Sequence, residues 1–361
     1  MNEPNSNLMA ISVSSLSPGT FAKGDIYAFD STLLLVERGT FLDDEKLERL
    51  KNLNSKKDLI YITTYDNPSK SHLKKRIDLI DTRRQEHEKK TGYATLVNET
   101  VELFAGISSD KTVEHEAIKD MSHDLSSRIE TTSPATILSL INALAPVDEY
   151  LQRHCVNTSL LNGLIGKWLG LTKNAIDRLV LIGLLHDCGK ALMPPSILSA
   201  NRRLTGAEFE VIKMHTVRSY ELLSAFPEAI RRAARNHHEK VNGTGYPDRL
   251  SLKDIPIESR ITSLSDIYDA MVSRRSYKEP RSPFSIMALL AKLKGEELDS
   301  KLVDLFIKHM PSELIGKQVM LSDGRIGVVS SCDLNNIEYP VVNIDGQEVD
   351  TDQELYCTYM C

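Results

Sequence analysis

The chain has 361 residues, of which 41% are hydrophobic and 26% charged, and its formal net charge is −6 at pH 7. This length predicts two or three domains, and the composition is that of a soluble globular protein. The acidic balance argues against a nucleic-acid-binding protein, because the basic footprint of that class is missing. It still admits a small anionic ligand held by local cations.

Three observations predict a cytoplasmic protein. No stretch approaches 18 apolar residues, so no membrane span is expected. The N-terminal sequence, Met1-Asn-Glu-Pro-Asn-Ser-Asn7, lacks the charged start and apolar core of a signal peptide. The five cysteines are odd in number and form no CxxC motif, which favours reduced thiols.

The first 65 residues predict a small, mostly β module. Short β-prone runs at 24–29 and 33–36 precede a helical pattern at 42–53, with Leu47 and Leu50 on one face. An apolar run at 59–62 then predicts a closing strand. The module shows no catalytic cluster and no glycine-rich phosphate loop.

Residues 66–132 are dense in charge. Between 70 and 90, Leu73, Ile77 and Ile80 recur at helical spacing among alternating charges, which predicts a long, exposed amphipathic helix. Two interpretations stay open, a solvated linker helix and a helix that forms a homodimer. The histidines of this region are interpreted as surface residues: His72, His87, His115 and His123.

Residues 133–312 predict an all-α domain of seven or eight helices, large enough for its own core. Its helix starts carry recognisable caps: Ser133-Pro134, Thr205-x-x-Glu208 and Ser282-Pro283. The fold class is therefore multidomain and mainly α, a helical bundle flanked by two smaller modules.

Residues 313–361 return to a β pattern. Asp323-Gly324 and Asp345-Gly346 each lie between apolar runs, as two-residue hairpin turns do. These runs predict a small meander or barrel without evident chemistry. We expect this C-terminal β module to be a structural or docking appendage.

The helical domain contains one unusual junction, where the apolar run from Leu181 ends in His186-Asp187 and continues into Gly189-Lys190. A carboxylate in apolar surroundings is costly unless a cation or hydrogen-bond donors compensate it. Taken alone, a His-Asp pair is more often a helix cap beside a buried imidazole. His123-Asp124 has a polar context and is interpreted as surface, so the case for His186-Asp187 depends on its surroundings.

Those surroundings are rich in metal-ligand residue types. A helical bundle that points such groups inward builds a metal site in its core. Seven nitrogen and oxygen ligands are too many for one ion, but Asp187 could bridge two. Imidazole with carboxylate and no thiolate suits iron, manganese or zinc, and two such ions are a recurring device for phosphoester hydrolysis. The seven candidates are His154, His186, Asp187, His215, His237, His238 and Asp266.

Four motifs together resemble the HD-GYP family, a branch of the HD phosphohydrolases that hydrolyses cyclic di-GMP. The resemblance covers about 148–309, roughly half of the chain. It rests on the long motifs His186-Asp187-x-Gly189-Lys190, His237-His238-Glu239, Asn242-Gly-Thr-Gly-Tyr-Pro247 and Arg260-Ile-x-x-x-x-Asp266-x-Tyr-Asp-Ala-Met-x-Ser-x-Arg275-x-Tyr-Lys278.

The resemblance implies an HD-type catalytic bundle with two divalent metal ions, iron or manganese first and zinc or nickel as alternatives. It implies that His154, His186, Asp187 and Asp266 surround one ion, and Asp187, His215, His237 and His238 the other. Asp187 and Lys190 would be catalytic, with the ammonium stabilising charge on the phosphate or leaving oxygen. Substrate contacts would come from Gly245, Tyr246, Arg275 and Lys278.

Some positions depart from the family pattern. Tyr150 stands where some members have a glutamate that helps to hold a third metal, which favours two ions here. Cys155 and Cys188 replace commoner residues, either as space-filling side chains or as redox-sensitive ones. Asn242 replaces a frequent aspartate at the head of the Gly-Tyr-Pro loop.

The expected function is a metal-dependent phosphodiesterase in which a hydroxide bridging two metals opens cyclic di-GMP to pGpG, GMP or both. One alternative is another cyclic dinucleotide substrate, such as cyclic GMP-AMP. A second is a weakly active cyclic di-GMP-binding signalling module. The expected partners are cyclic di-GMP, a second copy of the chain, and proteins that dock on the Gly-Tyr-Pro loop or the flanking modules; no nucleic-acid polymer is expected.

Overall fold

The computed structural model divides the chain into two compact units, residues 1–79 and 80–361. It describes residues 7–13, 16, 20–22, 26–28, 34–36, 41–53, 59–64, 92–110, 112–113, 115–142, 150–198, 200, 202, 204–273, 281–323 and 325–360. The predicted charged helix at 70–90 lies outside the described residues, and so do Arg275 and Lys278.

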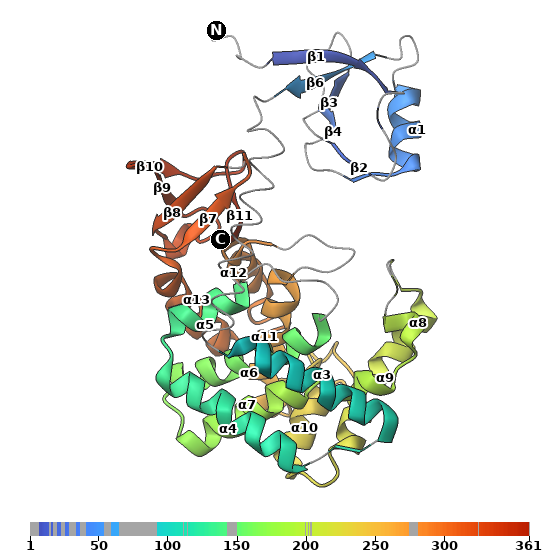
Figure 1. Ribbon diagram of the computed structural model, residues 1–361, viewed down its shortest axis with the longest axis vertical. Helices are drawn as coiled ribbons and strands as arrows, with labels where there is room; N and C mark the ends of the chain where they lie inside the picture. Colours follow the sequence, from blue (N-terminus) through green and yellow to red (C-terminus); the bar gives the residue numbers. More distant parts are fainter. Residues whose placement is uncertain are drawn as a thin grey trace. The chain divides into compact units, whose positions relative to one another are not determined.

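In the N-terminal unit, the described residues form antiparallel strands and the helix α1 (Figure 1). Its main sheet has the order β1-β6-β3-β4, and β2 pairs separately with β5. The elements are β1 Asn7–Ser12, β2 Thr20–Phe21, β3 Ile26–Ala28, β4 Leu34–Val36, β5 Phe41–Leu42, α1 Asp44–Leu53 and β6 Leu59–Thr64. Leu47 and Leu50 of α1 are buried with Ile26, as their spacing predicts. Strand β1, which was not predicted from the sequence, pairs with β6 along its whole length.

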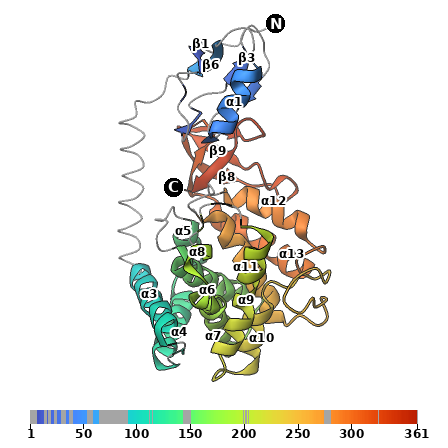
Figure 2. The ribbon, with the colours of Figure 1, turned by 90° about the vertical axis from the view of Figure 1, so that its right-hand side faces the viewer.

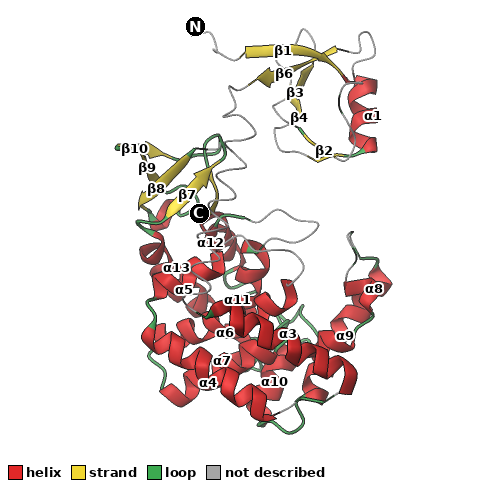
Figure 3. Cartoon of the chain, viewed as in Figure 1, coloured by secondary structure: helices red, strands yellow, loops and turns green. Residues whose placement is uncertain are grey.

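The second unit is mainly helical and ends in a small sheet (Figure 3). Its first helices are α3 Tyr93–Asp110, α4 His115–Thr131, α5 Pro134–Asn142, α6 Tyr150–Trp168 and α7 Lys173–Leu185, followed by the 3-10 turn η2 Cys188–Leu192. The later helices are α8 Pro195–Leu198, α9 Gly206–Leu222, α10 Glu228–Asn236, α11 Ile257–Val272, α12 Pro283–Leu293 and α13 Ser300–Leu314.

Helices α6 and α7 form the centre of this bundle. They pack closely because Gly183 of α7 faces the backbone of α6, where a Cβ would lie 2.4 Å from the Ser159 Cα. The three predicted helix caps are present, since the side chains of Ser133, Thr205 and Ser282 each accept a hydrogen bond from a first-turn N–H. Among the described residues, no helix combines the length and hydropathy needed to span a bilayer.

Helices α3 and α4 belong to the bundle, which differs from the predicted start of the helical domain at residue 133. Figures 1 and 2 show α3 and α4 beside α6 and α7. Tyr93, Leu96 and Phe104 of α3, with Leu125 and Ile129 of α4, are buried in the same core as α6. The high charge of 66–132 hid these apolar stripes, which lie between exposed polar residues.

The C-terminal sheet is antiparallel, with the order β10-β9-β8-β7-β11. Its elements are β7 Gln318–Leu321, β8 Ile326–Ser331, η3 Leu334–Asn336, β9 Val341–Ile344, β10 Gln347–Asp350 and β11 Cys357–Met360. Asp345 and Gly346 both have positive φ, which confirms the predicted tight turn between β9 and β10. Val319 and Val342 join the core of the helical bundle, so the sheet packs on the helices rather than forming a core of its own.

Candidate metal centre

The end of helix α7 presents His186 and Asp187 inside the bundle. His186 keeps helical geometry and donates its N–H to the Ile182 carbonyl, and the chain then tightens into η2. Gly189 is required by packing, because a Cβ there would lie 2.1 Å from the His215 carbonyl oxygen of α9. Gly189 lies inside η2 and not at the end of α7, which is capped by His186, so the close approach between η2 and α9 is what requires a glycine here.

The structure brings all seven predicted ligand residues together from five parts of the bundle. His154 comes from α6, His215 from α9 and Asp266 from α11, and the others come from the ends of α7 and α10. They form two groups, in each of which the nearest ligand atoms lie within 4.8 Å of one another. The α6 group is His154, His186 and Asp266, and the α9 group is Asp187, His215, His237 and His238.

Asp187 joins the two groups. Its Oδ1 lies 3.2 Å from His215 Nε2 and 3.7 Å from His237 Nε2. Its Oδ2 lies 3.5 Å from His186 Nε2 and 3.6 Å from His154 Nε2. One carboxylate thus faces both groups with different oxygens, which is the geometry that the predicted bridging role requires.

The lone pairs of the imidazoles converge on one another. The Nδ1 atoms of His186, His215 and His237 lie 2.6–2.8 Å from the carbonyl oxygens of Gly183, Ile212 and Ala234. A carbonyl only accepts, so each Nδ1 donates and each neutral ring keeps an unprotonated Nε2. These Nε2 atoms point at one another and at Asp187.

Such an arrangement fits a cation. His215 Nε2 and His237 Nε2 are 3.5 Å apart, and Asp187 Oδ1 is buried without a hydrogen-bond partner. Bringing lone pairs and a carboxylate together in a buried site is unfavourable unless a positive charge lies between them. The donor set, imidazole and carboxylate, suits a divalent transition metal.

The ionisation states agree with this interpretation. Burial alone would raise the pKa of Asp187, but the Lys190 ammonium beside it holds that pKa well below its usual value. Burial lowers the pKa values of His186 and His237. The carboxylate is therefore ionised and these imidazoles are neutral, which are the states that bind metal.

His154 differs from the other histidines. Its Nδ1 lies 2.6 Å from Asp269 Oδ2, a carboxylate from α11, while its Nε2 lies 3.0 Å from Asp266 Oδ1. Burial lowers the pKa of His154, but the hydrogen bonds with Asp266 and Asp269 outweigh it and raise the pKa to about 9. Asp269 in turn accepts from Asn157 Nδ2 at 2.7 Å and from Ser273 Oγ at 3.1 Å.

Lys190 and the Gly-Tyr-Pro loop lie beside the two groups. Lys190 Nζ donates to Asp187 Oδ2 and keeps part of its side chain exposed. Glu239 is buried and accepts from the backbone N–H groups of Asp248 at 2.6 Å and Leu250 at 3.0 Å, so it holds the loop in place. Asn242 accepts from the Thr244 N–H and hydroxyl, which shows that an amide serves at this loop position.

Gly245 has a packing reason to be glycine. A Cβ there would lie 2.4 Å from the Lys240 nitrogen and 2.6 Å from the His238 carbonyl oxygen. The loop can therefore lie directly on the backbone that follows His237. A substrate contact by Gly245 stays a prediction.

Tyr246 forms part of an aromatic group that extends outward from the metal centre. Its ring centroid lies 4.8 Å from that of His238 and 6.4 Å from that of Phe209 in α9. Lys213 Nζ lies 5.6 Å from the Tyr246 centroid and 5.0 Å from the Phe209 centroid. Phe209 is 46% exposed, so this group offers an accessible aromatic face next to a cation.

The structure also bears on the predictions made for Tyr150, His123 and the two cysteines of the helical domain. Tyr150 stacks on the His154 ring at 5.7 Å, so it packs against a candidate ligand rather than adding one. His123 is exposed, as predicted. Cys155 and Cys188 are fully buried and burial raises the pKa of each thiol, to about 12 for Cys188, which favours the space-filling interpretation.

Asp269 and Asn157, which support His154, were not predicted from the sequence. A signal for Asp269 exists, because it follows Asp266 by three residues and therefore lies on the same face of α11. Phe209 and Lys213 were also missed as neighbours of Tyr246, although their spacing of four residues places them on one face of α9.

Comparisons with known proteins agree with this geometry. Residues 139–302 match the model of the HD domain family. The 3'3'-cGAMP-specific phosphodiesterase 2 of Vibrio cholerae is 32% identical over 199 residues, which are 54% of this chain and 38% of that protein. The cyclic di-GMP phosphodiesterase response regulator RpfG of Xanthomonas campestris is 32% identical over 205 residues, 55% of this chain and 54% of that protein. The matches thus span about half, or less, of these relatives.

A solved structure of Bd1817, an HDG"Y"P protein from Bdellovibrio bacteriovorus, is 19% identical, with a TM-score of 0.49, and covers 83% of this chain and 98% of that one. The family match and the relatives agree with the motifs around His186-Asp187 and the Gly-Tyr-Pro loop. Residues 139–302 therefore form an HD domain, and the motifs within it are those of the HD-GYP type.

Proposed function

We propose that the chain is a metal-dependent phosphodiesterase that hydrolyses cyclic di-GMP to pGpG, GMP or both. The observation that carries this proposal is the pair of ligand groups joined by Asp187, because its two oxygens face different groups. A carboxylate shared in this way supports a two-metal site of the kind used for phosphoester hydrolysis.

The seven residues would hold two divalent ions, His154, His186, Asp187 and Asp266 around one and Asp187, His215, His237 and His238 around the other. When bound, such ions supply Lewis-acid stabilisation of phosphoryl oxygens and lower the pKa of a coordinated water. Iron or manganese is our first expectation and zinc or nickel the alternative, since the same ligands accept all four.

Lys190 would contribute a fixed positive charge. Its ammonium already contacts Asp187 Oδ2 and remains partly exposed, so a bound phosphate can reach it. A cation in this position stabilises negative charge on the phosphoryl or leaving oxygen as the ester bond breaks. The buried surroundings strengthen that interaction, because few waters compete for the charge.

The aromatic group beside the metal centre supports a substrate that carries a base. Tyr246 and Phe209 together offer rings on which a purine can stack, and such stacking contributes about 1–3 kcal/mol per base. Lys213 offers donors only, which suits the two acceptors on the guanine edge, O6 and N7. Arg275 and Lys278 remain proposed contacts for the phosphate and guanine.

Two alternatives stay open. Cyclic GMP-AMP shares the phosphates and one guanine of cyclic di-GMP, and one relative bears the name of a phosphodiesterase specific for it. A weakly active module that binds cyclic di-GMP and signals through partners is the second alternative. The complete set of seven ligand residues supports the enzyme, because loss of Asp187 or His237 would be expected in a module that only binds.

The cellular setting is also proposed. We infer a cytoplasmic homodimer, with the charged segment at 70–90 as the dimer element and with further partners at the Gly-Tyr-Pro loop or the flanking modules. A chain starting at Tyr93 tests the dimer element. If sedimentation shows that it is as dimeric as the full chain, the segment at 70–90 is not responsible.

The function is tested by purifying the protein anaerobically and counting bound metal. Turnover of cyclic di-GMP and of cyclic GMP-AMP is then followed by chromatography with iron or manganese added. We expect two ions per chain and turnover of cyclic di-GMP to pGpG or GMP. Two ions with tight nucleotide binding but no turnover would instead support the binding module, and faster turnover of cyclic GMP-AMP would reassign the substrate.

A further inference from the structure

His154 is held by a chain of buried hydrogen bonds that ends on helix α3. Tyr93 Oη donates to Asn157 Oδ1 at 2.6 Å, and Asn157 Nδ2 donates to Asp269 Oδ1 at 2.7 Å. Asp269 Oδ2 accepts from His154 Nδ1 at 2.6 Å. Tyr93 is 2% exposed and Asp269 is fully buried, so solvent cannot replace these partners.

In this series of hydrogen bonds from Tyr93 to His154, the donor and the acceptor of each bond can be assigned. A carboxylate accepts, so His154 donates through Nδ1 to Asp269, and Nε2, which lies 3.0 Å from Asp266 Oδ1, is the ring atom that remains to bind a metal ion. Because the Asn157 side-chain nitrogen donates to Asp269, the Asn157 side-chain oxygen accepts a hydrogen bond from the Tyr93 hydroxyl. A carboxylate hydrogen-bonded to a ligand histidine fixes the ring orientation and makes the imidazole a more basic ligand.

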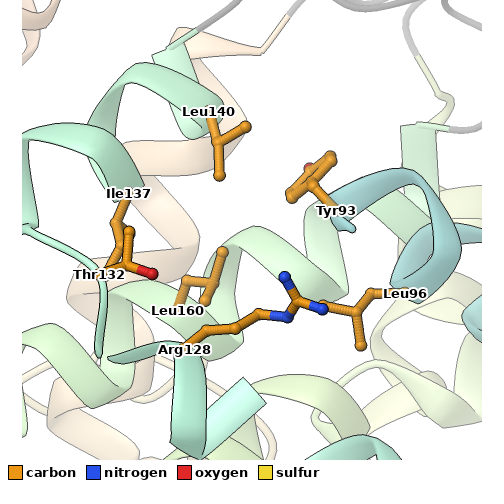
Figure 4. Close-up of a pocket in the computed structure, with 7 residues that line it drawn as sticks. All are labelled: Tyr93, Leu96, Arg128, Thr132, Ile137, Leu140 and Leu160. Atoms are coloured by element: carbon orange, nitrogen blue, oxygen red, sulfur yellow. The ribbon is translucent and has the colours of Figure 1, made fainter. Parts of the chain in front are cut away.

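Tyr93 lies outside the matched HD domain at 139–302. It is the first residue of α3, and its ring lines a small pocket between α3, α4, α5 and α6 (Figure 4). In Figure 4, Leu96 lies with it on α3, while Ile137 and Leu140 of α5 face them. The start of α3 is thus in direct polar contact with the support of His154.

We infer that Tyr93 is a positioning residue for the metal ion of the α6 group, acting through Asn157 and Asp269 on His154. This inference rests on the proposed use of the seven residues as metal ligands. It means that a residue upstream of the HD domain sets the metal affinity of one group and leaves the other unchanged.

The test compares Tyr93→Phe with Tyr268→Phe. Tyr268 is also fully buried and donates to an asparagine, Asn142, at 2.8 Å, but the Asn142 side-chain nitrogen has no hydrogen-bond partner among the described residues. Metal is titrated into each metal-free protein against a chromophoric chelator, and thermal unfolding of the metal-free proteins is measured in parallel.

We expect Tyr93→Phe to weaken binding of one of the two ions about tenfold, at the low end of the effect of outer hydrogen-bond partners on metal affinity. The second ion keeps its affinity, and Tyr268→Phe keeps both. Equal affinities in Tyr93→Phe and the unmodified protein overturn the inference, as does an equal loss in both tyrosine variants.

A second variant, Asn157→Ala, separates the chain of hydrogen bonds from independent effects. Residues that act as one unit are not additive, so Tyr93→Phe in the Asn157→Ala background should add no further loss of affinity. An additive loss shows that Tyr93 acts by another route and overturns the inference.

If the unmodified protein binds two ions and hydrolyses cyclic di-GMP while the tyrosine variant is unchanged, only this inference fails. If it binds no metal, the proposed function fails with it.

Discussion

The two ligand groups are built in different ways. In the α9 group, His215 and His237 are oriented by carbonyl oxygens three residues earlier in their own helices. In the α6 group, His154 is oriented by Asp269, which is 115 residues away in the sequence. His215 and His237 therefore depend on local backbone contacts within single helices, whereas His154 depends on tertiary packing between α3, α6 and α11.

This difference has a chemical consequence. A carbonyl oxygen fixes a ring without adding charge, and the pKa of His237 lies well below its usual value because of burial. The carboxylates at His154 have the opposite effect and raise its pKa to about 9. The α6 group thus has the more basic imidazole and also the support that a distant substitution can disturb.

The largest effect is expected when Asp187, which both groups share, becomes Ala. Both ions should bind more than about a hundredfold more weakly, beyond the usual effect of an outer partner, and hydrolysis of cyclic di-GMP should be lost. Asp124→Ala is the control, because Asp124 also follows a histidine but pairs with Arg128 on the surface. Retention of both ions in Asp187→Ala would contradict the bridging role.

Asp269→Ala should separate the two groups. We expect a loss of about 10–100-fold in the affinity of one ion, because His154 loses the acceptor that fixes its tautomer. His215 and His237 of the α9 group use backbone carbonyls instead, so the second ion should keep its affinity. A chelator titration with two resolved binding steps measures the affinity of each ion. A parallel loss of both affinities would mean that the two groups are not independent.

The α9 group should be sensitive to backbone packing instead. Gly189→Ala puts a methyl group against the His215 carbonyl and should lower the free energy of unfolding by about 1–3 kcal/mol. The matched control is Gly106→Ala in α3, where a Cβ meets nothing within 4 Å. That change should raise stability by about 0.5–1 kcal/mol, since alanine is the better helix former.

Chemical denaturation of the metal-free proteins measures both glycine variants. A stable Gly189→Ala protein would show that η2 and α9 can move apart, and the tight approach would then not be what holds His215 in place.

The smallest expected effect concerns substrate alone. Phe209→Ala should raise KM for cyclic di-GMP about tenfold, within the range for loss of one stacked base, while both metal affinities stay unchanged. Met214→Ala serves as the control, because Met214 is 44% exposed on the same helix as Phe209. Steady-state kinetics measure KM for cyclic di-GMP in both variants. An unchanged KM in Phe209→Ala would mean that the aromatic group is not part of the substrate site.

Four of the seven ligand residues could be placed from the sequence because they directly follow helices and belong to long motifs. His186-Asp187 and His237-His238 each follow an apolar helix pattern, so their position in the bundle could be inferred from periodicity. Tyr93 carried no such signal. It lies in a charged region, and its partner Asn157 is 64 residues away, so only the packing of α3 on α6 reveals the contact.

Boundaries were less predictable than elements. The start of the bundle was expected at residue 133, but Leu96 and Leu125 belong to its core. Their apolar stripes are diluted by exposed charges, and the sequence alone does not say which other helix such a stripe will contact. The C-terminal turn at Asp345-Gly346 was predictable because its backbone requirement is local.

The distance in sequence between His154 and Asp269 also affects when each ligand group can be completed during synthesis. The α9 group is complete once His238 has been made, whereas the α6 group needs Asp266 and its support Asp269. Domains generally fold from the N-terminus as the chain is synthesised, and contacts distant in sequence form late. A growing chain therefore contains all the proposed ligands of the α9 group before it contains those of the α6 group.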